Sequence, residues 1–357
     1  MLHSGFKLKT ALDFNLHSPV YTVVVAANNS PASMKNVAKY VCDGVDDQVQ
    51  INDALTDVYN TGGGKVILTN GQFEAKTAIY GKSKVSLEGS GLSTILNIDA
   101  GTPNNWAIKA YIGDTYFSVR NLKIIVNSNI SVIHLDSEFS QIEDVYSDGG
   151  SGFALNGNNN IARNNFVKNS SSAGISGNGT DGLIENNHCI ACDYGIDGVG
   201  DRCKITGNIT QDCVQFGIHA AGGIDITIEG NITFNNTKHG IYISGTPYKI
   251  IDNVIYLNKR NGILSYYGAN NIISGNIVKD NSQEADNTYN EIELYANGNG
   301  NIIRNNNVRC TAPNKAQNGI KIGAGDYNII VGNLIENTYT KINNAGVNDV
   351  VAHNQEI

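Results

Sequence analysis

One short phrase repeats along the second half of the chain, and this repetition limits the fold more than any other feature. An aliphatic residue, two free positions and an Asn recur, as in Ile184 to Asn187 and Ile205 to Asn208. A period near twenty residues with Gly and Asn at the corners is typical of a solenoid. The recurring asparagines are Asn165, Asn187, Asn208, Asn231, Asn253, Asn276, Asn306, Asn333 and Asn354, so most intervals are 21 to 23 residues and two are longer.

A second phrase, Gly-Ile, lies between consecutive asparagines. It occurs at Gly174, Gly195, Gly217, Gly240, Gly262 and Gly319. Each repeat therefore holds at least two short stretches of alternating apolar residues, separated by turn residues and without helical spacing. This pattern predicts an all-β chain in which each repeat is one coil of a parallel β-helix.

Residues one period apart lie directly above each other in such a fold, because stacked strands are about 4.8 Å apart. We expect the Asn column to turn the chain in a left-handed conformation and to pair its side-chain amides along the stack. We expect the matching aliphatic column to fill the interior, namely Ile184, Ile205, Ile228, Ile250, Ile273, Ile303 and Ile330.

The first part of the chain differs from the later repeats. Residues 1–40 show no clear period, so we interpret them as an N-terminal extension or arm. Residues 41–62 predict one amphipathic helix that covers the first coil, with Asp46 or Asp47 as its cap and Gly62 to Gly64 at its end. Residues 63–357 form the β-helix domain. The expected helix face is Ile51, Ala54, Leu55, Val58 and Tyr59.

The same region carries a family resemblance. The stretches Asp43-Gly-Val-Asp-Asp-Gln48, Gly63 to Phe73 and Val85-Ser-Leu-Glu-Gly-Ser-Gly91 resemble the opening of pectate-lyase-like β-helix proteins, including phage tailspikes. The later repeats resemble the right-handed β-helix repeats of that superfamily. The resemblance implies a single-stranded right-handed parallel β-helix. It implies no one reaction, since the superfamily includes lyases, hydrolases, uronan epimerases and noncatalytic spikes.

Composition excludes several partners. The net charge is −8 and charged residues make up 16 %, which argues against nucleic acid. No apolar run is long enough to span a membrane, and residues 1–30 lack the order of a signal peptide. We therefore expect an extracellular or virion protein without a signal peptide in this chain. The tailspike resemblance also suggests a homotrimer.

The six cysteines and the acidic residues raise the question of a metal. Cys189, Cys192, Cys203 and Cys213 fall at different points of successive coils, so we expect buried thiols and no zinc. Cys192 and Cys213 are nearly one period apart and could bridge. We expect no cofactor, with Ca²⁺ at Asp43, Asp46 and Asp47 as the weaker alternative to helix capping.

If the Ile of each Gly-Ile phrase points inward, the next residue points outward, and these residues form one surface column. We call this column the stripe. It contains an acid, an imidazole, a phenol and a second acid, which suits carbohydrate chemistry. The stripe is Ala154, Ser176, Asp197, His219, Tyr242, Leu264, Glu293 and Lys321.

We predict catalytic roles for Asp197, His219, Tyr242 and Glu293. Asp197 would be the nucleophile or the water-activating base, His219 or Tyr242 would handle the proton, and Glu293 would be a second acid or position the sugar. In an elimination reaction, His219 or Tyr242 would be the base, and Lys238 or Lys249 would neutralise charge. The structural alternative is a solvated polar face.

Two insertions lie ahead of the stripe, at residues 282–290 and around 310–315, and insertions on one edge of a solenoid commonly line its binding face. We expect Glu284, Asp286 and Tyr289 to form a wall there, with loops of no function as the alternative. The predicted substrate-binding residues are Tyr194, Asp201, His239, Tyr266, Glu284, Tyr289 and Lys321.

Family motifs are incomplete. Tyr194-Gly-Ile-Asp197 resembles a stretch of alginate C5-epimerases, but Val199 stands where their His is expected. Lys238-His239-Gly240-Ile241 resembles polygalacturonases, whose acids are missing from the preceding coils. The Arg-x-Pro-x-x-Arg motif of pectate lyases is absent. We predict a polysaccharide-degrading hydrolase or lyase that binds a glycan. A noncatalytic glycan-binding or structural spike and a uronan C5-epimerase are the alternatives.

Overall fold

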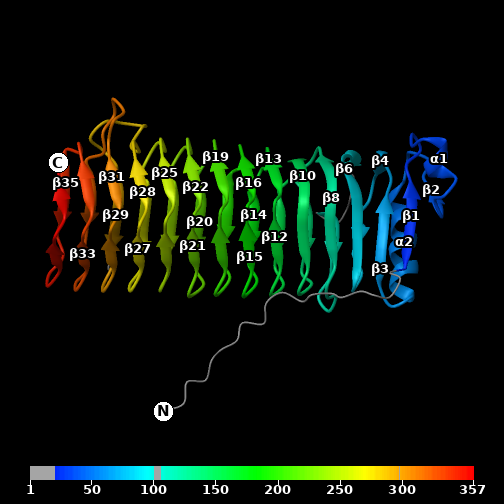
Figure 1. Cartoon of the computed structure of the whole chain (residues 1–357), viewed down its shortest axis with the longest axis horizontal. Helices are drawn as coiled ribbons and strands as arrows, with labels where there is room; N and C mark the ends of the chain where they lie inside the picture. Colours follow the sequence, from blue (N-terminus) through cyan, green and yellow to red (C-terminus); the bar gives the residue numbers. More distant parts are fainter. Residues whose placement is uncertain (1–20, 100–105, 297) are drawn as a thin grey trace, which may run out of the picture.

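The protein is a straight rod of stacked coils. The computed structural model describes residues 21–99, 106–296 and 298–357, and all structural statements concern these residues. Parallel strands run across the long axis of the rod and are stacked along it, with the N-terminal helices at one end and the C-terminal coil at the other (Figure 1). The predicted right-handed parallel β-helix is confirmed.

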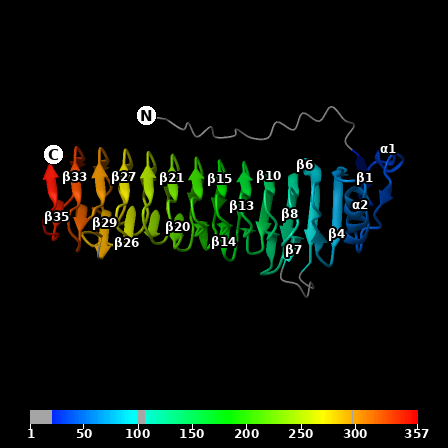
Figure 2. The ribbon, with the colours of Figure 1, turned by 90° about the horizontal axis from the view of Figure 1, so that it is seen from below.

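Each regular coil contributes one strand to the smaller sheet, which we call sheet B. Its strands are paired in chain order, and Figure 2 shows them along one side of the rod. They are β5 (Ile79–Tyr80), β7 (Trp106–Ala110), β9 (Ser131–Leu135), β11 (Phe153–Leu155), β14 (Ala173–Gly177), β17 (Tyr194–Gly198), β20 (Ile218–Ala221), β23 (Ile241–Ser244), β26 (Ile263–Tyr267), β29 (Asn290–Ala296), β32 (Asn318–Ile322) and β35 (Thr340–Asn344).

The larger sheet, sheet A, receives two short strands from each later coil. The first stack is β12 (Ile161–Arg163), β15 (Leu183–Glu185), β18 (Lys204–Thr206), β21 (Thr227–Glu229), β24 (Lys249–Ile251), β27 (Ile272–Ser274), β30 (Ile302–Arg304), β33 (Ile329–Val331) and β36 (Val350–Ala352). The second is β13 (Phe166–Lys168), β16 (His188–Ile190), β19 (Ile209–Gln211), β22 (Ile232–Phe234), β25 (Val254–Tyr256), β28 (Ile277–Lys279), β31 (Asn307–Arg309), β34 (Leu334–Glu336) and β37 (Gln355–Glu356).

In the early coils these two stacks merge into single long strands. The long strands are β6 (Val85–Ile98), β8 (Ser118–Val126) and β10 (Gln141–Gly149), and they follow β1 (Thr22–Ala26), β2 (Tyr40–Val41), β3 (Gly64–Leu68) and β4 (Gly71–Ala75). β10 pairs with both β12 and β13, so the split of one strand into two happens at this coil. The Asn bend of the repeat phrase is the point of division.

The interior is filled as the period predicts. The aliphatic column from Ile184 to Ile330 is 0–1 % exposed, and its members are direct strand partners, as with Ile205 and Ile228. The isoleucines of the Gly-Ile phrase, such as Ile196 and Ile218, are also fully buried. Inward-facing residues of both sheets therefore form one continuous core.

The recurring asparagines form a ladder of hydrogen bonds. Asn208 donates from its backbone N and from Nδ2 to Oδ1 of Asn231, at 2.9 and 3.0 Å, and the pattern runs from Asn165 to Asn354. The predicted amide pairing is confirmed. The left-handed backbone is not at the ladder asparagine, however. It falls one residue earlier, at Asn186, Asp252 and Asn305, or at glycines such as Gly207. The ladder residue itself turns inward to reach its neighbours.

Two further ladders were not predicted. One runs through Asn236, Asn258 and Asn281, and it ends on the carboxylate of Glu291. Glu291 Oε1 accepts the backbone N of Asn281 at 3.0 Å, and Oε2 accepts Nδ2 at 2.5 Å. The other runs through Asn271, Asn301 and Asn328 and ends on Asp349. In both, the carboxylate supplies the acceptor where the next coil has no Asn.

The N-terminal region combines helices with an unexpected strand. β1 lies within the range interpreted as an extension, but it pairs with β3, because Val23, Val24 and Val25 continue the apolar sheet. Helix α1 (Ala32–Lys35) follows it. Helix α2 (Gln48–Asn60) lies at the end of the rod and contacts β1, β3 and β5 (Figure 1). Residues 1–20 of the extension lie outside the described residues.

Helix α2 largely follows the predicted pattern. Ile51, Ala54, Leu55 and Val58 are fully buried, whereas Tyr59 is 48 % exposed at the last turn. Asp47 occupies the N-cap position, yet its side chain does not cap the helix. Its carboxylate accepts the backbone N of Gly44 and of Glu74 instead, both at 2.8 Å. The predicted capping hydrogen bond is therefore wrong, and Asp47 ties the helix to β4.

All six cysteines are free and buried, which excludes a bridge between Cys192 and Cys213 in this structure. Burial raises the pKa of the Cys192 thiol to about 11. Within the described ranges, no helix is long and apolar enough to cross a membrane.

Candidate active site

The outward residues of sheet B form a single column. Strand registers pair Ala154 with Ser176, Ser176 with Asp197, and Asp197 with His219, and continue through Tyr242, Leu264 and Glu293 to Lys321. The stacking of the stripe is as expected from the period. The column also extends backwards to His134 and Lys109, which the sequence analysis did not include.

Asp197 and His219 form a hydrogen-bonded pair in the middle of the stripe. His219 Nδ1 lies 2.8 Å from Asp197 Oδ1, and the two side chains are 21 % and 28 % exposed. A carboxylate can only accept, so Nδ1 carries the hydrogen, and in the neutral imidazole Nε2 keeps its lone pair. The pair therefore presents a base that is oriented by its carboxylate.

Aromatic rings surround this pair. The ring of Tyr242 stacks on that of His219 at a centroid distance of 5.2 Å, and the ring of Tyr194 lies 5.3 Å from the same imidazole. Phe216 lies 5.4 Å from His219 and 5.0 Å from Tyr242. The structure thus brings together Tyr194, His219 and Tyr242, all of which the sequence analysis selected.

Sequence reasoning missed Phe216, although a signal was present. Tyr194, Phe216 and His239 each precede the Gly of a Gly-Ile phrase, so they form a second column beside the stripe. The ring of His239 lies 5.5 Å from that of Phe216. Reading the residue before each Gly would have found this column.

The protonation of the neighbouring groups limits their roles. Burial, with a contribution from Tyr267, raises the pKa of Tyr242 above its usual value, so the phenol keeps its proton. Burial, followed by the charges of Arg260 and Lys238, lowers the pKa of His239 to about 3. His239 Nδ1 accepts the backbone N of Asn261 at 3.2 Å, so a neutral His239 is a donor through Nε2.

One cation beside the pair has no carboxylate partner among the described residues. Lys238 Nζ donates to Gln215 Oε1 at 2.8 Å and lies 5.5 Å from the centre of the Phe216 ring. Gln215 in turn donates to Asp193 at 3.1 Å. Lys249, the other candidate for charge neutralisation, lies on β24 in sheet A and is remote from the stripe.

Glu293 belongs to a separate group. Its carboxylate binds Lys321 Nζ at 2.9 Å and accepts the amides of Asn261 and Asn290 at 2.6 and 2.8 Å. Four strand steps separate it from Asp197, which is about 19 Å at 4.8 Å per step. Paired carboxylates in glycosidases are about 5–9.5 Å apart. Glu293 therefore does not act on the same bond as Asp197. This contradicts its predicted role as the second acid.

The remaining predicted binding residues are spread along the same side. Tyr266 lies 6.1 Å from Tyr242 and 5.0 Å from Tyr295, ring to ring, so it extends the aromatic row. Asp201 lies in the turn after β17, where Oδ1 accepts the backbone N of Ile224 at 3.0 Å. This contact gives Asp201 a structural role in the turn.

The two insertions pack against each other. Asp286 Oδ1 accepts the backbone N of Lys315 at 2.8 Å, and Gln283 Nε2 donates to the carbonyl of Asn314 at 3.1 Å. Glu284 pairs with Arg260 at 2.7 Å, and this hydrogen bond lowers the pKa of the carboxyl. The guanidinium of Arg260 also lies over the ring of Tyr289. The insertions form one ordered projection beside the Glu293 group.

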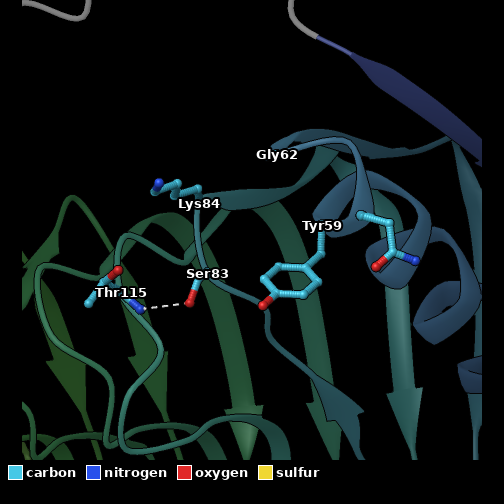
Figure 3. A pocket seen from close by; sticks show the side chains of 6 residues that line it. Tyr59, Gly62, Ser83, Lys84 and Thr115 are labelled. Carbon is cyan, nitrogen blue, oxygen red and sulfur yellow. Dashed lines mark hydrogen bonds between the residues drawn. The ribbon is translucent and has the colours of Figure 1, made fainter.

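A pocket of about 550 Å³ lies elsewhere, near the end of α2. Tyr59, Asn60, Gly62, Ser83, Lys84 and Thr115 line it (Figure 3). The backbone N of Thr115 donates to Ser83 Oγ at 3.2 Å across its edge. It contains no pair of a base and an acid like that of the stripe.

The carboxylates considered for a metal ion lie just before helix α2. No group of three or more His, Cys, Asp or Glu side chains within the described ranges is arranged to hold a metal ion. Asp43 and Asp47, suggested as Ca²⁺ ligands, accept backbone N–H groups of Val45, Gly44 and Glu74. Their oxygens serve the local fold, so these residues do not fit a Ca²⁺ site.

The sequence matches the family described as right handed beta helix region, over residues 106–249 and 151–308. Together the matches span more than half of the chain. The chain belongs to this family. No curated protein matches it.

Solved structures with the same fold include an epimerase, a glucanase and a tailspike protein. The A-module of Azotobacter vinelandii mannuronan C-5 epimerase AlgE6 has a TM-score of 0.79 and 18 % identity, over 88 % of this chain and 96 % of that one. The catalytic unit of the Streptomyces thermodiastaticus GH87 alpha-1,3-glucanase has a TM-score of 0.65 and 13 % identity, over 88 % of this chain and 67 % of that one. The Dettilon tailspike protein has a TM-score of 0.60 and 16 % identity, over 90 % of this chain and 68 % of that one. At these identities the likeness shows the fold.

Proposed function

We propose that this protein is a polysaccharide-degrading enzyme that cleaves a uronic-acid-containing glycan by elimination. The observation that supports this most is the pair of His219 Nδ1 and Asp197 Oδ1 at 2.8 Å, with the phenol of Tyr242 on the next coil. An oriented base and a protonated acid one coil apart are the two groups that elimination requires. A glycan substrate agrees with the activities of the mannuronan epimerase and the alpha-1,3-glucanase that share this fold.

In this proposal His219 Nε2 removes the proton from the carbon next to the sugar carboxyl group. The electrons of that C–H bond form a double bond to the neighbouring ring carbon, and the glycosidic C–O bond at that carbon breaks. Tyr242 gives its proton to the leaving oxygen. The raised pKa of Tyr242 keeps this proton available, and Asp197 stabilises the imidazolium that forms.

Lys238 is a further side chain with a proposed role in the elimination. Proton removal beside a carboxylate builds negative charge, so a cation near the sugar carboxyl lowers the barrier. Lys238 lies over the ring of Phe216, which in turn contacts His219, and it has no carboxylate partner among the described residues. Hydrolysis by two carboxylates is less well supported, because Glu293 is about 19 Å from Asp197.

The test is incubation with alginate, pectate, acidic bacterial exopolysaccharides and a neutral glucan. We expect unsaturated ends, detected by absorbance, together with new reducing ends on an acidic glycan. Asp197→Asn, His219→Ala and Tyr242→Phe should abolish both. Reducing ends without unsaturated ends would replace elimination by hydrolysis. Uptake of deuterium from heavy water without chain cleavage would indicate C5 epimerisation, which shares the proton-removal step.

A noncatalytic glycan-binding rod is the second candidate. It is favoured by the contacts of Glu293, since its ion pair with Lys321 and its hydrogen bonds from Asn261 and Asn290 give this stripe carboxylate a structural role. A wild-type protein that retains a glycan in affinity electrophoresis but releases no product from any polysaccharide would support this candidate over the enzyme.

We further propose that the protein acts outside the cell or on a virion and that it is a homotrimer, since long rods can bury side faces against one another. Light scattering coupled to size-exclusion chromatography tests the oligomer. A mass equal to one chain of 38.2 kDa would contradict the trimer.

A further inference from the structure

A second polar cluster lies on the same face, closer to the N-terminus. Lys109 and His134 are the two stripe residues before Ala154, and they are direct strand partners on β7 and β9. Asp136 and Asn156 stand two residues after the stripe positions of their coils. The cluster therefore projects from three consecutive coils of sheet B.

The ammonium group of Lys109 is buried although it projects from the outer face. Its side chain is 3 % exposed and pairs with Asp136, and Nζ lies 4.6 Å from the centre of the Trp106 ring and 5.5 Å from that of Tyr111. Removing a charge from water is costly unless the charge is paired and hydrogen-bonded. Lys168 on sheet A has partners of the same kinds, the carboxylate of Asp148 and the ring of Tyr146, but its side chain is 32 % exposed. Burial distinguishes the two lysines.

Two side chains contact the same ring nitrogen of His134. Its Nε2 lies 2.8 Å from Asn156 Nδ2 and 3.1 Å from Asp136 Oδ1. Burial, followed by the charge of Lys109, lowers the pKa of His134, so the ring is neutral and cannot satisfy a donor and an acceptor equally. The buried Nε1 of Trp106 has no hydrogen-bond partner in the described part of the chain. The cluster thus has unused hydrogen-bonding capacity.

A polar path leads from this cluster towards the Asp197–His219 pair. Asn178 Nδ2 donates to Asn156 Oδ1 at 2.8 Å, and Ser176 Oγ donates to Asn178 Oδ1 at 3.1 Å. Ser176 is the strand partner of Asp197. The intervening stripe residues, Ala154 and Ser176, are small. The surface between the two groups is therefore continuous and unobstructed by large stripe side chains.

We propose that Lys109, His134, Asp136, Asn156 and Trp106 form a second glycan-binding site, which holds a sugar residue through its hydroxyl groups. The charge of Lys109 is already neutralised by Asp136, so the site does not require an anionic group. The imidazole of His134 and the amide of Asn156 suit hydroxyls, and the aromatic rings suit the apolar face of a pyranose.

His134 in this site lies three strand steps from Asp197, or about 14 Å, on the same stripe. A glycan that runs along the rod axis contacts both places, whereas a short oligosaccharide occupies only one. The inference takes the kind of ligand from the proposed function, but it does not require turnover.

The test measures binding of the Asp197→Asn variant to size-graded oligouronates prepared from alginate and pectate, by titration calorimetry. In this background, Trp106→Ala and His134→Gln should weaken binding of long chains about tenfold, or 1.4 kcal/mol, and leave short ones unchanged. Tyr146→Ala is the matched control, since it removes an aromatic ring with a lysine over it from sheet A.

Thermal unfolding of each variant separates loss of binding from loss of fold, and His134→Gln retains similar side-chain size if Trp106→Ala does not fold. Equal affinity of His134→Gln and its parent for every chain length would overturn the site, as would the absence of binding to any probe. Failure of the wild type to cleave, with length-dependent binding intact, would refute the elimination mechanism and leave this inference standing.

Discussion

The outer faces of sheets A and B have the same coil geometry but different side-chain environments. On sheet A, the pair of Lys204 and Glu229 is 50 % and 42 % exposed. On sheet B, the pair of His219 and Asp197 is 21 % and 28 % exposed and enclosed by aromatic rings. Exposed pairs contribute little to stability, so this pair on sheet A has the features of a solvated surface. The difference teaches that burial and aromatic contacts, more than the presence of charge, distinguish the Asp197–His219 pair, and this distinction supports the proposed site on sheet B.

The largest expected effect is on the sheet B pair. His219→Ala removes the proposed base, so kcat should fall at least about a hundredfold, within the usual range for general base catalysis. Initial rates on the acidic glycan that the wild type cleaves measure this. Glu229→Gln on sheet A is the control and should retain full activity. Equal losses in the two variants would remove the functional distinction between the faces.

The next effect concerns stability beneath sheet B, and it must be separated from activity. Burial raises the pKa of Glu291 to about 7, while hydrogen bonds from Asn281 partly oppose this. The folded state then binds more protons than the unfolded state between pH about 4 and 7, so stability falls as pH rises through that range. The loss is about 3 kcal/mol when the full shift is used.

Glu291→Gln should flatten this pH dependence, because the amide does not titrate. Chemical unfolding at several pH values between 4 and 8 measures it. If the variant keeps the slope of the wild type, another group is responsible. A pH profile of activity that follows the stability curve would also mean that the profile does not report His219.

A smaller effect is expected in the asparagine ladder that divides sheet A. Asn231→Ala leaves the backbone N and Nδ2 of Asn208 without their acceptor in a buried site, which costs about 1–3 kcal/mol. Urea unfolding should show the loss, while kcat at a temperature well below unfolding stays unchanged. A variant with native stability but reduced kcat would show that sheet A contributes to function.

The smallest effect is expected for the exposed ion pair of sheet A. Glu229→Gln should change the free energy of unfolding by less than about 1 kcal/mol, because solvent screens the pair. Urea unfolding at low and high salt measures the change. A loss of several kcal/mol would show that sheet A pairs are also structural, and the contrast between the faces would weaken.

Much of the fold and part of the candidate site could be predicted because a solenoid converts sequence period into spatial contact. The spacing of Ile205 and Ile228 was enough to place both in the core as neighbours, and that of Asp197 and His219 was enough to place them side by side. The early coils were harder to interpret. There β6, β8 and β10 run through the bend without a ladder Asn, so the stripe could not be extended to Lys109 and His134.

The sequence by itself determined the stacked coils, their buried columns and the order of residues along the stripe, since one residue per coil per column follows from the period. Only the tertiary structure decided that Glu293 joins Lys321 and Asn261 rather than Asp197, that Asp47 binds β4 instead of capping its helix, and that Lys109 is buried. These outcomes depend on side-chain direction, on burial and on contacts between columns. A repeat pattern specifies none of these, because it records only which residues share a column.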